Sequence, residues 1–252
     1  MTIVREADVK VGITTVTFNC EKTISRTIES VLNQTYPNIQ YVIMDGKSTD
    51  KTVEIARSYE DKFKEKNIPF TVVSEKDNGM YDAMNKANAL LDVELIGNVN
   101  GDDYYELDAV SKMVEFYKKE KFDVAWGDLR LIKPSGNMIK KAKLNKHIWT
   151  TTGWCHPTMF ATKKLLTEYP YICHDMYDDF DFATAAFKSG KKICVLNEVL
   201  SNFTFGGIST KKSLEEAMKR AEITYDIYRR HGMSKLYYLQ RICFEFIKLI
   251  LS

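Results

Sequence analysis

The amino-acid sequence predicts an α/β fold in which a mostly parallel sheet is flanked by helices, with a helical appendage at the C-terminus. Two observations predict this class. Strand-like runs of β-branched and apolar residues alternate with segments of helical periodicity through the first hundred residues. Three of these runs end in polar residues, as parallel strands do where ligands bind beyond their carboxyl ends. The 252 residues are enough for one large domain with a sizeable core.

The first half of the chain shows this alternation most clearly. Repeated βαβ units of this length favour a parallel sheet with helices on both faces. Ser48 or Thr49 is expected to cap the second helix. The expected strands lie at residues 9–18, 39–45, 70–75 and 93–100, and the expected helices at residues 23–34, 53–56 and 80–91.

The second half is less regular. A glycine is expected just after a helix, and Gly190 takes that place. Strands are expected at residues 122–132 and 191–205 with a short one within 156–162, and helices from about 163, at 178–190, at 213–231 and at 235–251.

Composition and charge exclude several classes of protein. The formal net charge of +2 gives no reason to expect a nucleic-acid partner. The five cysteines form no CxxC pair, which predicts reduced thiols in a cytoplasmic protein without a disulfide framework. The N-terminal segment lacks the apolar core of a signal peptide, and no run of about 18 apolar residues would span a membrane.

Adjacent carboxylates at Asp102 and Asp103 follow an apolar strand directly. Neighbouring negative charges repel each other, so a compensating cation is expected. Mg²⁺ or Mn²⁺ would suit the pair, because these ions prefer oxygen ligands and complete their shells with water and diphosphate. The alternative is a solvated turn before the helix that begins near Asp108. The position after three βα units favours the metal site.

A second acid, Asp45, ends the strand at residues 39–45. Its carboxylate could accept hydrogen bonds from a nucleobase or a ribose, although acids are also common in the turns that follow strands. Lys47 stands where a phosphatase of the haloacid-dehalogenase type needs a second aspartate, which excludes that class. Polar residues also crowd the first turns of the helix at 80–91, where an ordinary amphipathic helix is the alternative.

Four segments, "TTVTFN", "VIMDGKSTDKT", "SEKDNGMYDAMNKA" and "NVNGDDYY", follow one another in this order. Together they resemble the inverting family-two glycosyltransferases of the GT-A fold, particularly members that build bacterial surface polysaccharides. The resemblance spans residues 11–207. It implies transfer of a hexosyl or N-acetylhexosaminyl group from a nucleotide-sugar, most often a UDP-sugar, with a divalent cation, Mn²⁺ or Mg²⁺.

The resemblance also implies roles for individual residues. Asp102 and Asp103 look like the metal motif, with Asp103 as the expected direct ligand and Asp102 also beside the donor nucleotide. Gly101 departs from the serine that is common in this subgroup, and it would leave the backbone free to approach a phosphate. The residues expected to hold the donor nucleoside are Val16, Phe18, Asp45 and Asp77.

Sugar transfer is faster when a carboxylate removes the proton of the acceptor hydroxyl. The family carries its base in an (E/D)D-aromatic-D segment, which Asp178 to Asp181 match, so Asp179 is the expected base and Asp178 the neighbouring alternative. Acids at a helix start are also favoured by the helix dipole. His156 is expected near the acceptor or the donor phosphates, or as a structural histidine. The segment 206–209 resembles the family's flexible loop.

These assignments divide the chain. A glycosyltransferase domain is expected over residues 1–210, with a nucleotide-binding half at about 1–103 and an acceptor-binding half at about 104–210. The helices at 211–252 would form an appendage. Its last helix, 235–251, either lies in the membrane interface or docks on the body or on a second subunit of a homodimer. A polar stripe crosses this helix at Arg241, Glu245, Lys248 and Ser252.

Interfacial placement would put the protein at the inner face of the cell membrane and would suit a polyprenyl-diphosphate-linked acceptor, whereas a glycan is the other acceptor class. Two rival functions fit the residues less well. A nucleotidyltransferase usually needs a Gly-rich, basic phosphate loop, and "TFNCEKT" is not one. A non-catalytic nucleotide-sugar-binding protein is disfavoured by the intact acids at Asp45, Asp103 and Asp179.

Overall fold

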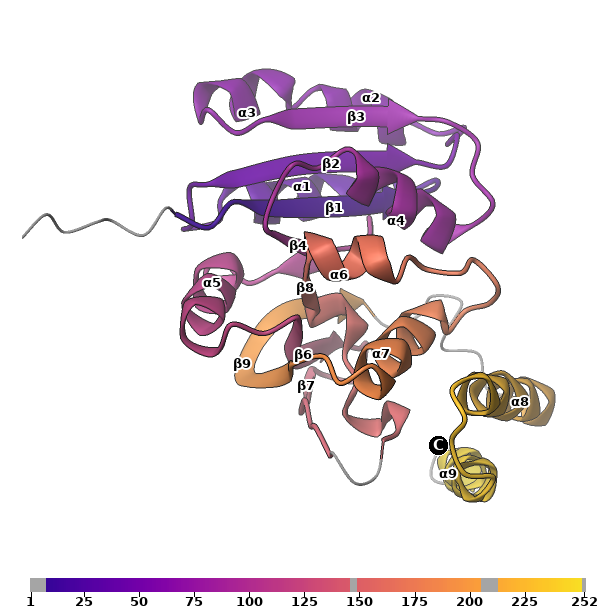
Figure 1. Ribbon diagram of the computed structural model, residues 1–252. Helices are drawn as coiled ribbons and strands as arrows, with labels where there is room; N and C mark the ends of the chain where they lie inside the picture. The colour runs from indigo at the N-terminus through magenta and orange to yellow at the C-terminus, as the bar shows by residue number, and fades with distance from the viewer. Residues whose placement is uncertain (1–7, 146–148, 205–212, 251–252) are drawn as a thin grey trace, which may run out of the picture.

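The computed structural model describes residues 8–145, 149–204 and 213–250 (Figure 1). The strands are β1 (Val11–Thr17), β2 (Ile39–Asp45), β3 (Phe70–Ser74), β4 (Leu95–Asn98), β5 (Tyr104–Tyr105), β6 (Val124–Ile132), β7 (Met138–Lys140), β8 (Phe160–Thr162) and β9 (Ile193–Thr204). The helices are α1 (Ile24–Leu32), α2 (Thr52–Arg57), α3 (Glu60–Glu65), α4 (Met80–Ala89), α5 (Ala109–Glu120), α6 (Lys163–Glu168), α7 (Asp178–Lys188), α8 (Leu214–Arg230) and α9 (Leu236–Ile250).

One sheet runs through the molecule in the order β3-β2-β1-β4-β8-β6-β9-β5, with β7 paired to β6. The strands from the first half, β1 to β4, pair in parallel, as expected. All seven residues of β1 are buried, which explains why its sequence is a continuous run without polar alternation. The second half is mixed, because β8 lies antiparallel between β4 and β6 while β6 and β9 are parallel.

Helices cover both faces of the sheet (Figure 1). One hydrophobic cluster joins α1, α2, α3 and α5 to one face, and a second joins α4, α6, α7 and α8 to the other. In α1, the spacing of Ile24, Ile28 and Val31 brings all three onto the buried side. Each fully buried side chain of this kind stabilises the fold by about 1.5–3 kcal/mol.

The expectation that Ser48 or Thr49 caps the second helix is wrong. The residue before α2 is Lys51, and neither Ser48 nor Thr49 bonds the helix. Ser48 instead donates from its backbone N–H and its hydroxyl to the Asp45 carboxylate. The serine therefore closes a turn at the end of β2, which is the competing use of a short polar side chain near a strand end.

Two helices complete the described chain, as expected. The Ser213 hydroxyl accepts a hydrogen bond of 3.0 Å from the Glu216 N–H and so caps α8. α9 packs along α8 at the lower right of Figure 1. No helix in the described part of the chain is long and apolar enough to cross a membrane. The loop expected at 206–209 lies outside the described residues.

Candidate active site

Three loops meet at the carboxyl ends of the parallel strands. In the sheet register, Asp45 at the end of β2 lies beside Thr17 of β1 on one side and Ser74 of β3 on the other. The turn after β4 returns to the same edge, because the Gly101 N–H donates to the Val16 carbonyl at 3.1 Å. The acids that follow three separate strands are therefore held at one edge of the sheet.

Asp45 is fully buried and fastens two of these loops. Its carboxylate accepts from the Ser48 N–H at 2.9 Å, from the Ser48 hydroxyl, and from the Ser74 hydroxyl at 2.6 Å. Asp77 lies next to the same turn, since a Cβ added to Gly46 would stand 2.6 Å from the Asp77 Oδ2. Asp77 is half-buried, so it is the more accessible of the two carboxylates.

The two apolar residues expected in the nucleoside pocket differ in exposure. Val16 is buried in β1, next to the turn that carries Gly101. Phe18 follows the strand with 61% of its surface exposed, so its ring is open to solvent beyond the strand end. An exposed aromatic ring at this edge offers a flat apolar surface to a nucleobase.

The acidic turn is tied to α1 and to the end of β9. The Asp102 carbonyl accepts hydrogen bonds of 2.8 Å from the Arg26 guanidinium and from the Thr204 hydroxyl. The Asp103 carbonyl accepts from the Thr27 hydroxyl at 2.6 Å. The backbone at both acids is therefore fixed by side chains from distant parts of the chain.

The Asp103 side chain is completely buried. Its Oδ1 accepts from the Thr204 N–H at 3.0 Å, and its Oδ2 has no hydrogen-bond partner. Burial, and next the charge of Asp102, raise the pKa of Asp103 to about 8, against the opposing effects of the Thr204 N–H and Arg26. Asp102 is only half-buried.

This donor set fits a divalent cation. An unpartnered buried carboxylate oxygen beside a second acid is compensated when a cation binds to it. Within the ranges that the structure describes, no third His, Cys, Asp or Glu joins the pair. The protein would thus supply Asp102 and Asp103, and water and a diphosphate would supply the other ligands, as is usual for Mg²⁺.

Gly101 has a packing role as well. A Cβ at this position would stand 2.7 Å from the Thr17 hydroxyl oxygen and 3.2 Å from the Cys20 sulfur. The absence of a side chain therefore lets the acidic turn pack against the end of β1. This close approach to protein atoms is a packing role in addition to the expected approach of the Gly101 backbone to a phosphate, which stays a prediction.

Asp179 lies in the first turn of α7 with 7% of its surface exposed. Its Oδ1 accepts a hydrogen bond of 2.8 Å from the Tyr81 hydroxyl, and its Oδ2 accepts one of 2.6 Å from the Trp154 indole N–H. Burial raises the pKa of Tyr81 well above 10, so its phenol remains a donor. Tyr81 belongs to the first turn of α4, four residues after Asp77, so one helix start connects the nucleoside loop with Asp179.

His156 belongs to the same aromatic cluster. Its Nε2 lies 3.3 Å from the Tyr171 hydroxyl, and its ring centroid is 6.3 Å from that of Tyr81. Burial lowers the pKa of His156, although the charge of Asp179 opposes this effect. The imidazole is therefore neutral near pH 7, and one ring nitrogen can donate while the other accepts.

The neighbouring Asp178 is used differently. Its carboxylate accepts from the backbone N–H groups of His174, at 2.7 Å, and Asp175, at 3.2 Å. It therefore fixes the loop ahead of α7, whereas Asp179 faces the aromatic cluster. Sequence reasoning missed Trp154 and Tyr171, and the only signal for Trp154 was its place two residues before His156.

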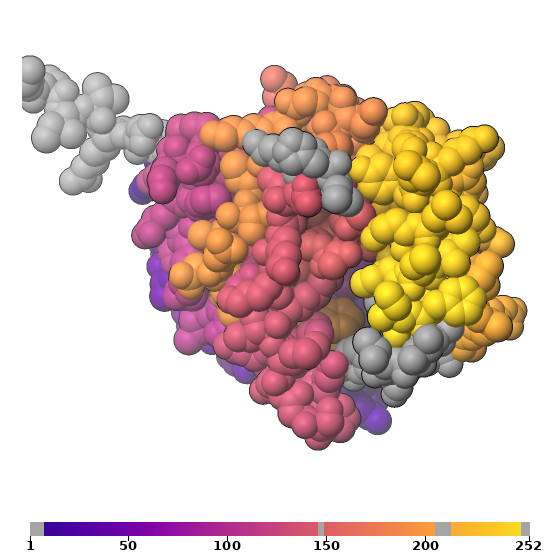
Figure 2. Space-filling view, turned by 90° about the horizontal axis from the view of Figure 1, so that it is seen from below, coloured from indigo at the N-terminus to yellow at the C-terminus, as the bar shows by residue number. Residues whose placement is uncertain are grey.

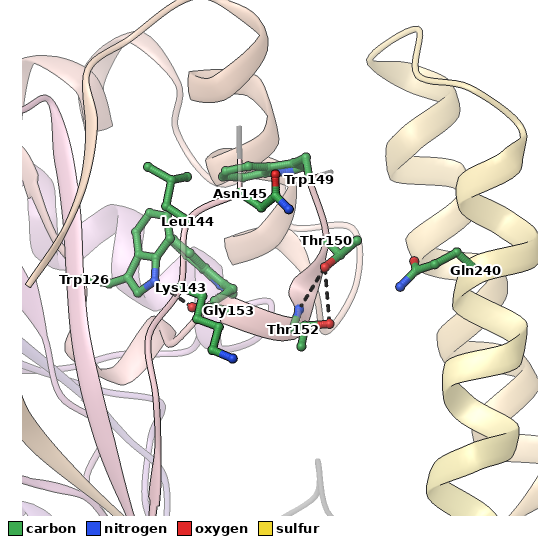
Figure 3. Close-up of a pocket in the computed structure, with 10 residues that line it drawn as sticks. Trp126, Lys143, Leu144, Asn145, Trp149, Thr150, Thr152, Gly153 and Gln240 are labelled. Atoms are coloured by element: carbon green, nitrogen blue, oxygen red, sulfur yellow. Dashed lines mark hydrogen bonds between the residues drawn. The ribbon is translucent and has the colours of Figure 1, made fainter. Parts of the chain in front are cut away.

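A cavity of about 240 Å³, which Trp154 also lines, lies between α9 and residues 143–145 and 149–154 (Figure 3). Figure 2 shows the corresponding hollow beside the C-terminal helices. Its walls combine indole rings with short polar side chains, and Lys143 is the charged residue among the lining residues that the structure describes. The lining residues are Trp126, Lys143, Leu144, Asn145, Trp149, Thr150, Thr152, Gly153, Trp154 and Gln240.

Known proteins match this chain in sequence. A PGL/p-HBAD biosynthesis glycosyltransferase of Mycobacterium bovis (strain BCG) is 26% identical over 210 residues, which cover 81% of this chain and 80% of that protein. A chondroitin synthase of Pasteurella multocida is 31% identical over 123 residues, or 48% of this chain and 12% of that protein.

Solved structures share the fold. TarS residues 1–349 of S. aureus, in complex with UDP-GlcNAc, give a TM-score of 0.72 at 19% identity and cover 92% of this chain and 70% of that one. The mannosyltransferase PcManGT from Pyrobaculum calidifontis, in complex with GDP-Man and Mn²⁺, gives a TM-score of 0.69 at 13% identity. The match covers 97% of this chain and 76% of that one. These likenesses confirm the expected GT-A fold.

The family match covers the residues that build the site. Residues 13–183 match the family described as glycosyl transferase family 2, and this range contains both the acidic turn after β4 and the carboxylate at the start of α7. The protein therefore belongs to glycosyltransferase family 2.

Proposed function

We propose that the protein is an inverting glycosyltransferase that moves a hexosyl or N-acetylhexosaminyl group from a UDP-sugar to a hydroxyl of its acceptor. The observation that carries this proposal is the environment of Asp179. Two donors, Tyr81 and Trp154, orient a largely buried carboxylate, and Tyr81 extends from the helix that follows the nucleoside loop. A carboxylate positioned in this way is suited to accept a proton from an attacking hydroxyl.

In the proposed reaction, Asp179 removes the proton of the acceptor hydroxyl as its oxygen attacks the anomeric carbon. The bond from that carbon to the diphosphate breaks on the opposite face, so the configuration inverts without an enzyme nucleophile. The proton stays on the Asp179 carboxyl group. The neutral His156 imidazole would donate a hydrogen bond to the acceptor or to a donor phosphate, whereas Asp178 acts by fixing its own loop.

The donor would be held at the strand ends. Val16, Phe18, Asp45 and Asp77 would contact the nucleoside, with Phe18 against the base and Asp77 as the accessible carboxylate. Asp102 and Asp103 would hold Mn²⁺ or Mg²⁺, which when bound neutralises the charge of the diphosphate leaving group. The printed titles of the solved neighbours, which name UDP-GlcNAc in one case and GDP-Man with Mn²⁺ in the other, support a nucleotide-sugar donor and a divalent cation.

For the acceptor we propose a glycan or a polyprenyl-diphosphate-linked sugar in surface-polysaccharide biosynthesis, at the cytoplasmic side of the membrane. The tryptophan-lined cavity supports this class, because indole rings and short polar groups suit a sugar ring. Lys143 would favour an acceptor that carries an anionic group. The cavity shares Trp154 with the site of Asp179, which brings it next to the proposed base.

The test is Asp179→Asn, assayed with a panel of UDP-, GDP- and dTDP-sugars and Mn²⁺. Loss of the base should lower sugar transfer and donor hydrolysis by about 10²–10⁴-fold. Binding of UDP with Mn²⁺, measured by calorimetry, should be retained, because Asp179 does not contact the nucleotide in this proposal. Asp226→Asn is the matched control, since that acid is exposed and pairs with the neighbouring Arg229 on the surface of α8. Wild-type turnover by the Asp179→Asn variant would refute the role of Asp179.

A further inference from the structure

The last helix, α9, has its charged residues inside. Arg241 and Glu245 are 3% and 2% exposed and form an ion pair of 2.8 Å. Glu245 also pairs with Arg220 of α8 at 2.9 Å, and Arg241 donates to the Thr151 hydroxyl at 2.5 Å. Arg241 and Glu245, the two residues of the polar stripe whose side chains the structure describes, therefore attach α9 to α8 and to the body.

The opposite face of α9 is apolar and exposed. Leu236, Leu239, Phe246 and Ile247 are 71%, 60%, 45% and 53% exposed, and Cys243 lies exposed between them. Their spacing places them along one side of the helix. No charged side chain interrupts this face among residues 236–247, since both charged residues there are buried. Contiguous exposed patches of this kind mark interaction sites.

The charge next to this face is positive. The last turn of α8 carries Arg229 and Arg230, and Lys235 precedes α9. Arg229 pairs with Asp226 at 3.3 Å and Arg230 with Asp181 at 3.0 Å, so three cations face two acids. Arg229 is 70% exposed, and Lys235 is exposed directly before the first turn of α9. An apolar helix face beside exposed cations is the pattern of a helix that lies in the interface of a membrane with anionic lipids.

A second copy of the chain fits this face less well. Four side chains that are about half to three-quarters exposed offer on the order of 400 Å², about half of the roughly 800 Å² that each partner buries in a standard interface. A bilayer does not need that area, because the apolar side chains enter it individually and the cations add electrostatic attraction.

We propose that the outward face of α9 docks onto the surface of a membrane that contains anionic lipids, with the helix parallel to the bilayer. Gln240, which follows Leu239 in sequence, lines the cavity that the tryptophans also line (Figure 3). Docking would therefore place this cavity next to the lipid surface. This last consequence rests on the proposed function and would present a lipid-linked acceptor to the enzyme from the membrane side. The docking itself does not depend on the reaction.

The experiment is co-sedimentation of the full chain with vesicles of phosphatidylcholine alone or of phosphatidylcholine with 30% phosphatidylglycerol, the fraction being chosen at about that of an anionic bacterial membrane. The wild-type protein should bind the anionic vesicles and bind the neutral ones at least about fivefold more weakly. Leu239→Ser with Ile247→Ser should lower binding to anionic vesicles at least about tenfold, because two inserted side chains are lost. Arg229→Gln with Lys235→Gln should abolish the preference for the anionic lipid.

The matched control is Leu90→Ser with Leu107→Ser, two leucines exposed to a similar degree just after α4 and before α5. This variant should bind as the wild type does, and unchanged thermal unfolding should show that all variants are folded. The proposal is overturned if the wild-type protein leaves both kinds of vesicle unbound, or if the α9 variant binds undiminished. It is also overturned if sedimentation velocity without lipid shows a wild-type dimer that the α9 variant abolishes. Vesicle binding is measured without sugar transfer. The docking proposal can therefore fail while the proposed function holds, and the proposed function can fail while docking is observed.

Discussion

Asp103→Asn replaces the buried, ionisable carboxyl group of the acidic turn with an amide of nearly the same shape. In the protein without metal, burial and the charge of Asp102 raise the pKa of Asp103 from 3.8 to about 8. An aspartate in the unfolded chain is ionised above about pH 4. Between these two values the folded protein binds one proton more than the unfolded chain, so its free energy of unfolding falls as the pH rises.

The size of this effect follows from the pH range between the pKa of Asp103 in the unfolded chain and its pKa in the folded protein. Each pH unit within this range lowers the free energy of unfolding by about 1.4 kcal/mol. From pH 5 to pH 8 the wild-type protein should therefore lose roughly 4 kcal/mol relative to Asp103→Asn, which has no proton to release at this position. Other titrating groups are common to both proteins and cancel in the comparison.

The assay is urea-induced unfolding in EDTA at pH 5, 6, 7 and 8. Mn²⁺ added at pH 8 should restore the stability of the wild-type protein and leave Asp103→Asn unchanged, because only the wild type offers a buried charge to compensate. Asp102→Asn is the control, and it should keep most of the pH dependence, since burial is the larger cause of the shift. Parallel pH profiles for the wild type and Asp103→Asn would refute the reasoning.

Two further substitutions test the neighbouring contacts. Trp154→Phe removes the 2.6 Å hydrogen bond to the Asp179 carboxylate, worth about 1.5–3 kcal/mol, and should slow sugar transfer about 10–150-fold without weakening UDP binding. An equal loss of both, read by steady-state kinetics and calorimetry, would contradict it. Arg241→Ala leaves the buried Glu245 with Arg220 as a remaining partner and should lower the free energy of unfolding by about 1–3 kcal/mol in urea. A loss under 1 kcal/mol, as for surface ion pairs, would show that the pair is solvated.

The sequence alone predicted the parallel half of the fold because its elements are defined by local pattern. The strand at 39–45 was expected with the bounds that β2 has, since a buried parallel strand is a continuous apolar run between turn residues. The two-residue β5 was not expected, because its pairing with β9 depends on residues about a hundred positions apart. No local pattern encodes such a contact.

The candidate site was predictable to the same extent. Acids at strand ends follow from position, so Asp45 and Asp103 could be proposed as site residues from the sequence, whereas the contacts of Asp179 with aromatic side chains could not. Tyr81 and Trp154 contact that carboxylate across 98 and 25 positions in sequence. The sequence marked Tyr81 only as one of the polar residues in the first turns of its helix, and Trp154 only by its place before His156. In α9 the periodicity showed the polar stripe but not that Arg241 and Glu245 would face inward. The usual rule is that the charged face of a helix meets solvent, and the buried ion pairs reverse it here.

The space between residues 17 and 101 holds one side chain, that of Thr17, because a Cβ at position 101 would stand 3.0 Å from the Thr17 Cβ. A serine at position 101 would therefore require the Thr17 side chain to shift or to be smaller. We expect a homologue with serine after its fourth strand to carry a smaller residue at the end of its first. Such an exchange of volume would leave the acidic turn in place through evolution, even though neither residue touches a substrate in the reaction proposed above.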